Sequence, residues 1–242
     1  MKAIYKDIVN KVAKGEKLLA VLLDPDKTPV TRIPAFIEKV NQSIAQYIFV
    51  GGSVVAKHIT EKIVIEIQKH THKPVVLFPG DVTQITPKAD ALLFLSLLSG
   101  DNPEYLIKQH VKAIPQLIKS PLEVIPTGYI LIESGKETSV QKVTQTQPIP
   151  RINIEETIHT AKAGEFLGMK LIYLEAGSGA VQTVSERTIS EVKQRLNIPL
   201  IVGGGIRNKK QLEKIYAAGA DIVVIGTAFE EDFSFFDKLK VK

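Results

Sequence analysis

The chain has 242 residues, of which 44% are hydrophobic, and it carries a formal net charge of +5 with no cysteine. Without cysteine it has no disulfide framework, thiolate metal ligand or thiol nucleophile, and without a long apolar run or a signal peptide we expect a cytoplasmic protein. The basic balance suits an anionic substrate or an anionic membrane surface, whereas lysines scattered without interleaved aromatic residues argue against nucleic acid.

Apolar runs of strand length alternate with amphipathic segments, and an apolar stripe through Ile4, Ile8 and Val12 predicts a helix before the first strand. The expected strands are Leu18–Asp24, Tyr47–Val50, Pro74–Phe78, Ala91–Leu98, Glu123–Glu133, Leu171–Glu175, Leu200–Val202 and Asp221–Ile225. The expected helices between and after them are Val30–Gln42, Val54–His70, Pro103–Ile118, Asn153–Leu167, Ser185–Leu196, Lys209–Ala218 and Glu231–Leu239. Continuous apolar strands separated by helices are typical of a covered parallel sheet. At this length they favour an α/β fold made of one (β/α)8 TIM barrel, as a single domain over residues 1–242.

Two segments depart from a regular barrel pattern. Between the third and fourth strands, residues 81–90 are too short and too interrupted by proline for a full helix, so we expect an irregular crossover. Residues 134–150 are polar and end in proline. A segment of that length indicates an active-site lid or an interface loop.

Three glycine turns follow predicted strands in the last third of the chain, at Gly177–Gly179, Gly203–Gly205 and Gly226. Glycine lets a phosphate approach the backbone, and the next helix points its N–H groups at the anion. Such turns also favour glycine for geometric reasons alone. The turns after the seventh and eighth strands are nevertheless the ones where barrels commonly hold phosphate, so we expect a phosphate cup here.

Glu175 stands directly before the first glycine turn. A carboxylate is a poor phosphate ligand, so it has another role. Tyr173 lies two residues earlier and shares its face of the strand. If both pointed outward under the helices, Glu175 would be a buried unpaired charge, which is costly. We therefore expect both side chains to point into the site.

Asp24 and Asp26 follow the first strand, with Pro25 between them. Paired carboxylates beside a phosphate site are typical of Mg²⁺ binding, although they also suit a capping turn. Ser53 could add a hydroxyl ligand or instead cap a helix beginning at Val54. Lys27 could neutralise a diphosphate or remain solvated. None of the five histidines lies at a predicted strand end, which argues against a three-histidine zinc site or a Ser-His-Asp triad.

The motifs LLDPDK, FVGGS, IPTGYILIESGKETSV, YLEAGSGA, VGGGIR and ADIVVIGTAFE occur in this order across residues 18–230. Together they resemble the geranylgeranylglyceryl phosphate synthase family, which includes the bacterial heptaprenylglyceryl phosphate synthases. The resemblance implies a prenyltransferase of ether-lipid biosynthesis. The C3 hydroxyl of sn-glycerol 1-phosphate would attack C1 of a prenyl diphosphate, with geranylgeranyl diphosphate as the expected donor, and pyrophosphate would leave. It also implies a homo-oligomer.

The resemblance also implies roles for particular residues. Asp24 and Ser53 match the Mg²⁺ ligands. From its own position, directly before the glycine turn expected to hold the substrate phosphate, we expect Glu175 to be the catalytic base. The matching glycerol-phosphate site comprises Tyr173, Leu174, Glu175, Ala176, Gly177, Ser178, Gly179, Gly203, Gly204, Gly226 and Thr227. Many members have asparagine where this chain has Thr227, but threonine keeps a hydroxyl donor and its backbone N–H.

The residues by themselves leave other functions open. They indicate a phosphate-binding barrel with a metal site and a carboxylate, which also fits a sugar-phosphate isomerase, epimerase or lyase. A non-catalytic phosphate-binding protein is a further alternative, although it would need neither Glu175 nor the metal turn.

Overall fold

The structure is a computed structural model, and it describes residues 3–56, 58–231, 235 and 239. Its strands are all parallel and close into a barrel in chain order, with β8 beside β1. They are β1 Leu18–Leu23, β2 Tyr47–Val50, β3 Val75–Leu77, β4 Ala91–Leu97, β5 Glu123–Leu131, β6 Leu171–Glu175, β7 Leu200–Gly203 and β8 Ile222–Ile225. The predicted TIM barrel is thus confirmed.

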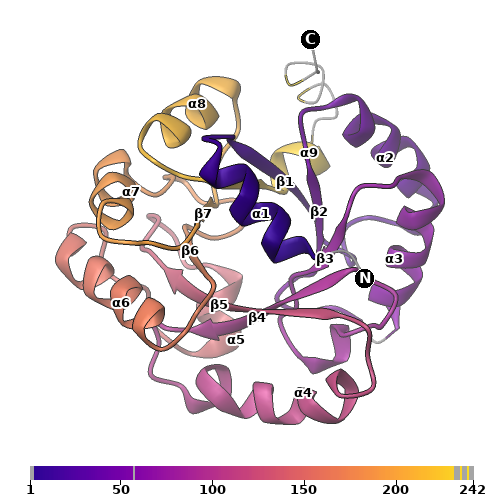
Figure 1. Cartoon of the computed structure of the whole chain (residues 1–242), viewed down its shortest axis with the longest axis horizontal. Coiled ribbons are helices and arrows are strands. Elements are labelled where there is room, and N and C mark those ends of the chain that lie inside the picture. The colour runs from indigo at the N-terminus through magenta and orange to yellow at the C-terminus, as the bar shows by residue number, and fades with distance from the viewer. Residues whose placement is uncertain (1–2, 57, 232–234, 236–238, 240–242) are drawn as a thin grey trace.

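Helices surround the barrel on its outer side (Figure 1). The α-helices are α1 Ile4–Ala13, α2 Ile33–Gln42, α3 Ile59–His70, α4 Gln109–Leu117, α5 Ser139–Thr144, α6 Ile154–Phe166, α7 Glu186–Lys193, α8 Lys209–Ala217 and α9 Thr227–Glu231. Shorter turns are the 3₁₀ helices η1 Val30–Arg32 and η2 Val82–Gln84 and the π-helix η3 Glu104–Lys108. Within the described residues, no helix combines the length and apolarity needed to cross a membrane.

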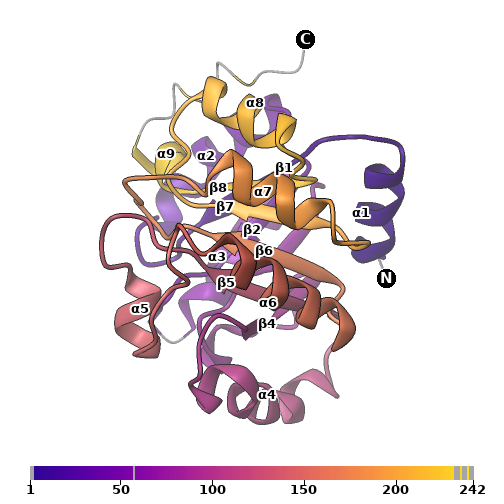
Figure 2. The same cartoon turned by 90° about the vertical axis from the view of Figure 1, so that its left-hand side faces the viewer.

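Alternating strand residues separate two buried layers. One layer fills the barrel and includes Leu18 and Ala20 of β1, whereas Leu19 and Val21 face the surrounding helices. Helix α1 lies across one end of the barrel and buries Ile4 and Ile8 in the inner layer (Figure 2). That end is the amino-terminal end of the strands, so the open end is the one where the β–α turns lie.

The irregular crossover between the third and fourth strands is confirmed, because η2 is a single turn and no α-helix follows it before β4. The helix expected over Val54–His70 begins only at Ile59, so its predicted start was wrong. Residues 54–56 and 58 are instead irregular, and His58 has a left-handed φ of 65°. The helix expected over Pro103–Ile118 opens as a π-helix, and the one expected over Glu231–Leu239 lies mostly outside the described residues.

Candidate active site

A polar cavity of about 320 Å³ occupies the open end of the barrel. It collects most of the side chains that the sequence singled out, from five of the eight strand ends. The expected site residues that line this cavity are Asp24, Asp26, Lys27, Ser53, Tyr173, Glu175, Ser178, Gly179, Gly204, Gly226 and Thr227. The expectation that Tyr173 and Glu175 point inward is therefore confirmed.

Glu175 is only 6% exposed, and its carboxylate Oε1 accepts a hydrogen bond from the Gly177 N–H at 2.6 Å. Burial raises the pKa of Glu175 to about 7, because the raising effect exceeds the lowering effects of the Tyr173 hydroxyl and the Gly177 N–H. The Tyr173 hydroxyl is itself buried and makes no hydrogen bond of full geometry with the described residues.

Glycine is required where β7 meets this carboxylate. A Cβ on Gly203 would lie 2.4 Å from the Tyr173 hydroxyl and 2.7 Å from Glu175 Oε2. A Cβ on Gly204 would lie 2.5 Å from Glu175 Oε1, and its φ of +89° also favours glycine. The GGG sequence, which begins at the last residue of β7, therefore makes room for the Glu175 side chain.

A chain of polar contacts joins the turns after β1, β6 and β8. Lys27 Nζ lies 3.2 Å from Asp24 Oδ2 and 3.5 Å from Ser178 Oγ, and Ser178 Oγ lies 3.1 Å from Thr227 Oγ1. The glycine turns after β6 and β8 are thus close together, with a lysine between them and the β1 carboxylate. Leu174 and Ala176 differ from the other expected site residues, because their side chains pack in the outer apolar layer and only their backbone can face a ligand.

The β1 and β2 turns supply oxygen atoms suited to Mg²⁺. Asp24 Oδ1 lies against Gly52, where a Cβ would come within 2.7 Å, and Ser53 is the next residue. One carboxylate, one hydroxyl and the oxygens of a diphosphate fit the usual Mg²⁺ shell. Asp26 has a local role, since its Oδ1 accepts the Ala56 N–H at 3.1 Å. No cluster of three or more acidic, histidine or cysteine ligands occurs among the described residues.

Gln84 was not expected from the sequence, yet it fixes the turn after β2. Its buried side chain accepts the Gly52 N–H at 3.2 Å and donates to the Gly52 carbonyl at 2.8 Å. A polar residue in an irregular segment gives no sign of such burial. The start expected for the next helix was wrong, so Ser53 does not cap a helix beginning at Val54.

Three aromatic rings form the floor of the cavity, and two of them were missed by the sequence reasoning. Tyr173 lies 5.3 Å from Tyr129 and 5.4 Å from Phe78, measured between ring centroids. Tyr129 and Tyr173 are direct partners in the β5–β6 register. An aromatic residue in an apolar strand has the pattern of an ordinary core residue. Tyr129 lies two residues before Leu131, which pairs with Glu175 in the register, and only this spacing could have indicated that Tyr129 belongs to the site.

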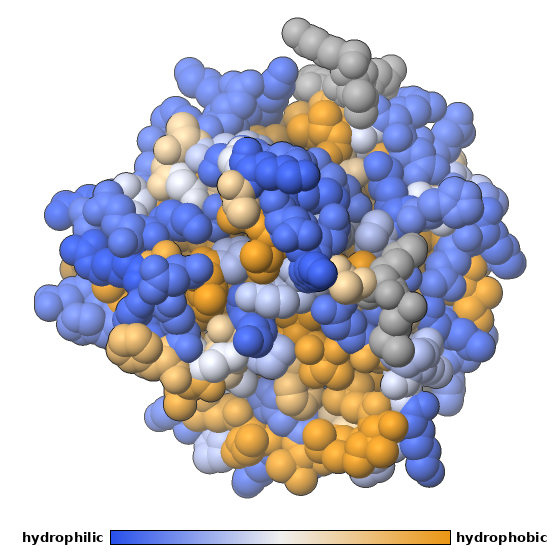
Figure 3. Space-filling view, in the orientation of Figure 1, coloured by the Kyte–Doolittle hydropathy of each residue, from blue (hydrophilic) through white to orange (hydrophobic). Residues whose placement is uncertain are grey.

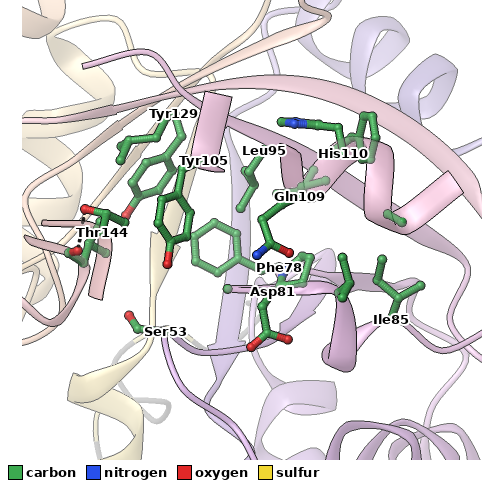
Figure 4. Close-up of a pocket in the computed structure, with 18 of the residues that line it drawn as sticks. Ser53, Phe78, Asp81, Ile85, Leu95, Tyr105, Gln109, His110, Tyr129 and Thr144 are labelled. Atoms are coloured by element: carbon green, nitrogen blue, oxygen red, sulfur yellow. Dashed lines mark hydrogen bonds between the residues drawn. The ribbon is translucent and has the colours of Figure 1, made fainter. Parts of the chain in front are cut away.

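An apolar pocket adjoins the polar cavity on the side of the missing crossover helix (Figure 4). Ser53, Phe78, Tyr129 and Val140 line both spaces. The walls of the apolar pocket are residues 78–81 after β3, then η2, β4, Tyr105 of η3 and α4, together with Val140, Val143 and Thr144 of α5. The segment 134–150 thus covers part of the site, and Tyr105 and Asn102 hold it through bonds to the Val143 and Thr144 carbonyls.

The model of the PcrB family matches residues 10–241 of the chain. The geranylgeranylglyceryl phosphate synthase of Flavobacterium johnsoniae is 55% identical over 234 residues, which cover 97% of this chain and 96% of that protein. The chain belongs to the PcrB family. Its relative of the same name from Korarchaeum cryptofilum is 39% identical over 222 residues, 91% of each chain.

A solved PcrB-family structure supports the same assignment. The (S)-3-O-geranylgeranylglyceryl phosphate synthase of Thermoplasma acidophilum, in complex with its substrate sn-glycerol-1-phosphate, matches with a TM-score of 0.92 and 33% identity. The match covers 99% of this chain and 96% of that one. The family resemblance seen in the motifs is therefore confirmed over nearly the whole length.

Proposed function

We propose that this chain is a prenyltransferase of the geranylgeranylglyceryl phosphate synthase type. It joins the C3 hydroxyl of sn-glycerol 1-phosphate to C1 of a prenyl diphosphate, with geranylgeranyl diphosphate as the expected donor. The observation that carries the proposal is the pair of adjoining spaces, one polar around Glu175 and one apolar beyond Phe78 and Tyr129. A water-soluble phosphate and a long hydrocarbon need such a divided site. The names and the bound ligand of the relatives support it.

In the reaction, an oxygen–carbon bond forms between the glycerol C3 hydroxyl and prenyl C1 while the bond from C1 to the diphosphate oxygen breaks. Pyrophosphate leaves with the bonding electrons, and the hydroxyl proton passes to Glu175. A base works best when its pKa lies near the operating pH. Because burial raises the pKa of Glu175 to about 7, this carboxylate meets that condition.

Glycerol phosphate is held by the three glycine turns. The backbone N–H groups at Ser178–Gly179, Gly203–Gly204 and Gly226–Thr227 receive the phosphate, with Lys27 nearby as a cation. Tyr173 orients the glycerol by donating its hydroxyl to the substrate rather than taking the proton. Burial, together with the nearby Glu175, raises the pKa of Tyr173 well above its ordinary value, so it stays a donor.

Asp24 and Ser53 would hold Mg²⁺ against the diphosphate. The ion supplies charge stabilisation for the departing pyrophosphate. Gln84 keeps this turn in place through both hydrogen bonds to Gly52. Phe78, Tyr129 and Tyr173 place aromatic faces where positive charge develops on the allylic carbon, an arrangement that favours cations electrostatically.

The test measures pyrophosphate release and identifies the product by mass spectrometry, with sn-glycerol 1-phosphate and donors from farnesyl to heptaprenyl diphosphate. We expect a prenyl ether of glycerol phosphate, formed best with geranylgeranyl diphosphate. Substitution of sn-glycerol 3-phosphate tests the enantiomer preference. Isomerised or cleaved sugar phosphates, with no prenyl ether from any donor, would assign the protein to the rival barrel enzymes instead.

Assembly as a homo-oligomer stays a prediction. Sedimentation velocity at several protein concentrations measures it directly, and a single monomeric species throughout would contradict it.

A further inference from the structure

The helix that walls the apolar pocket has a second apolar face, turned outward. Ile107, Val111, Ile114 and Ile118 are 56%, 63%, 42% and 77% exposed. Their spacings of four, three and four residues place them along one side of the η3–α4 helix. We call these four residues the α4 stripe. Figure 3 shows an apolar patch along the lower edge of the molecule, where Figure 1 places α4.

A row of lysines runs beside the α4 stripe. Lys108, Lys112 and Lys119 are all exposed and, being four and seven residues apart, share a different side of the helix. Lys112 pairs with Glu104. Glu104 is the only acidic residue in the stretch 104–119, so the exposed surface of this helix is apolar on one side and positive on the next.

From this pattern we propose that α4 is the face by which the enzyme rests on an anionic lipid surface. A helix of this kind buries its apolar stripe at the boundary between headgroups and acyl chains, while its lysines contact the anionic headgroups. The net charge of +5 acts in the same direction.

The charges distinguish this partner from a second copy of the chain. Two copies packed stripe to stripe in the antiparallel sense would set their lysine rows side by side, with Glu104 as the only carboxylate on each helix to offset them. Lysine is also depleted in protein–protein interfaces. An anionic membrane satisfies the stripe and the lysine row together.

The position of α4 gives the contact a purpose. Its inner face contributes Gln109, His110 and Ala113 to the apolar pocket, so a single helix separates the pocket from the proposed lipid surface. A prenyl diphosphate is amphiphilic and partitions into membranes, so docking would bring the pocket to the donor. Only this purpose rests on the proposed function, because the pattern of the surface does not depend on the reaction.

Flotation of the intact protein with lipid vesicles tests the proposal without an activity measurement. Vesicles of phosphatidylcholine mixed with phosphatidylglycerol should bind the protein, pure phosphatidylcholine much less, and added salt should weaken binding. The variant Val111→Ser/Ile118→Ser should lose about tenfold or more in affinity. Val181→Ser/Ile152→Ser, which removes two other exposed apolar side chains, is the matched control and should bind as the wild type does. Lys108→Glu/Lys119→Glu should lose the preference for anionic lipid.

Circular dichroism and the turnover of detergent-solubilised donor should stay unchanged in the stripe variant, since neither residue lines either cavity. If the wild type does not float with anionic vesicles, or if the stripe variant floats equally well, the proposal is wrong. If the stripe variant instead dissociates an oligomer in sedimentation velocity and the wild type ignores vesicles, the α4 stripe is a contact between copies. Vesicle binding by a protein that makes no prenyl ether would leave the lipid contact standing and overturn only the proposed function.

Discussion

Replacing Glu175 with glutamine should make the protein more stable and less active at the same time. A carboxyl group whose pKa is higher in the folded state than in the unfolded chain binds more protons when folded, so its contribution to stability falls as pH rises through that interval. For Glu175 the interval runs from 4.5 to about 7. At about 1.4 kcal/mol per pKa unit, the ionised group costs the wild type about 3 kcal/mol above neutral pH.

Glutamine keeps the shape of the side chain and can still accept the Gly177 N–H, but it carries no charge to desolvate. Denaturant unfolding of both proteins should therefore give similar stabilities near about pH 4.5 and a growing advantage for Glu175→Gln up to about pH 8. Turnover should fall about 10²- to 10⁴-fold, with substrate binding largely kept. If Glu175 only positions the hydroxyl, glutamine would serve almost as well and turnover would stay within a few-fold of the wild type.

Glu165→Gln is a control of opposite sign. Burial raises the pKa of Glu165, but Lys162 and the Asn197 N–H outweigh it and hold that pKa below its usual range. Stability lost in Glu165→Gln should thus be largest at neutral pH and vanish in acid. A stability difference between Glu175→Gln and the wild type that did not change with pH would refute the electrostatic account of Glu175.

Three further variants probe the rest of the site. Gly204→Ala should raise the KM for glycerol phosphate about tenfold or more, because its Cβ meets Glu175 Oε1, whereas Gly219→Ala, also at positive φ but remote, should leave that KM unchanged. Asp24→Asn should lower turnover about a hundredfold or more and remove its dependence on added Mg²⁺. Normal rates in this variant, or wild-type activity in excess EDTA, would contradict the metal site. Gln84→Met keeps the length of the side chain but loses both hydrogen bonds to Gly52. The Mg²⁺ concentration for half-maximal rate should therefore rise several-fold, which is more than the loss of stability, measured by the thermal midpoint, would cause. An unchanged Mg²⁺ titration would leave Gln84 with a purely structural role.

The sequence predicts this fold well because most strands are short, nearly continuous apolar runs separated by amphipathic helical segments, a pattern typical of a covered parallel sheet. The inward direction of Glu175 followed from the cost of burying a charge under helices, and the structure bears it out. Prediction from the local sequence pattern failed where tertiary contacts determine the backbone conformation. Residues 54–56 look like the first turn of α3, but Asp26 binds the Ala56 N–H and ties this stretch to the β1 turn.

The same limit explains what was missed in the site. Phe78 and Tyr129 have the appearance of core residues, and only the barrel register brings them beside Tyr173. Gln84 is hidden by lying in a polar loop, although its side chain is fully enclosed. His110 is another case, since it belongs to a helix in the pattern and yet lines the apolar pocket.

Helix α1 covers the amino-terminal end of the barrel, and this determines where reactants enter and products leave. Ile4 and Ile8 fill that end, so the barrel interior, as far as the described residues form it, opens at the end where the β–α turns lie. Both reactants must enter, and both products must leave, on the side where the β–α turns lie. Under the proposed function, pyrophosphate formed beside Asp24 would share its exit with a bulky lipid whose tail would lie in the adjoining pocket. Because the two products would leave by the same opening, the shape of the barrel would constrain the order of their release. Pyrophosphate that stayed bound would occupy the place of the diphosphate group of the next donor molecule.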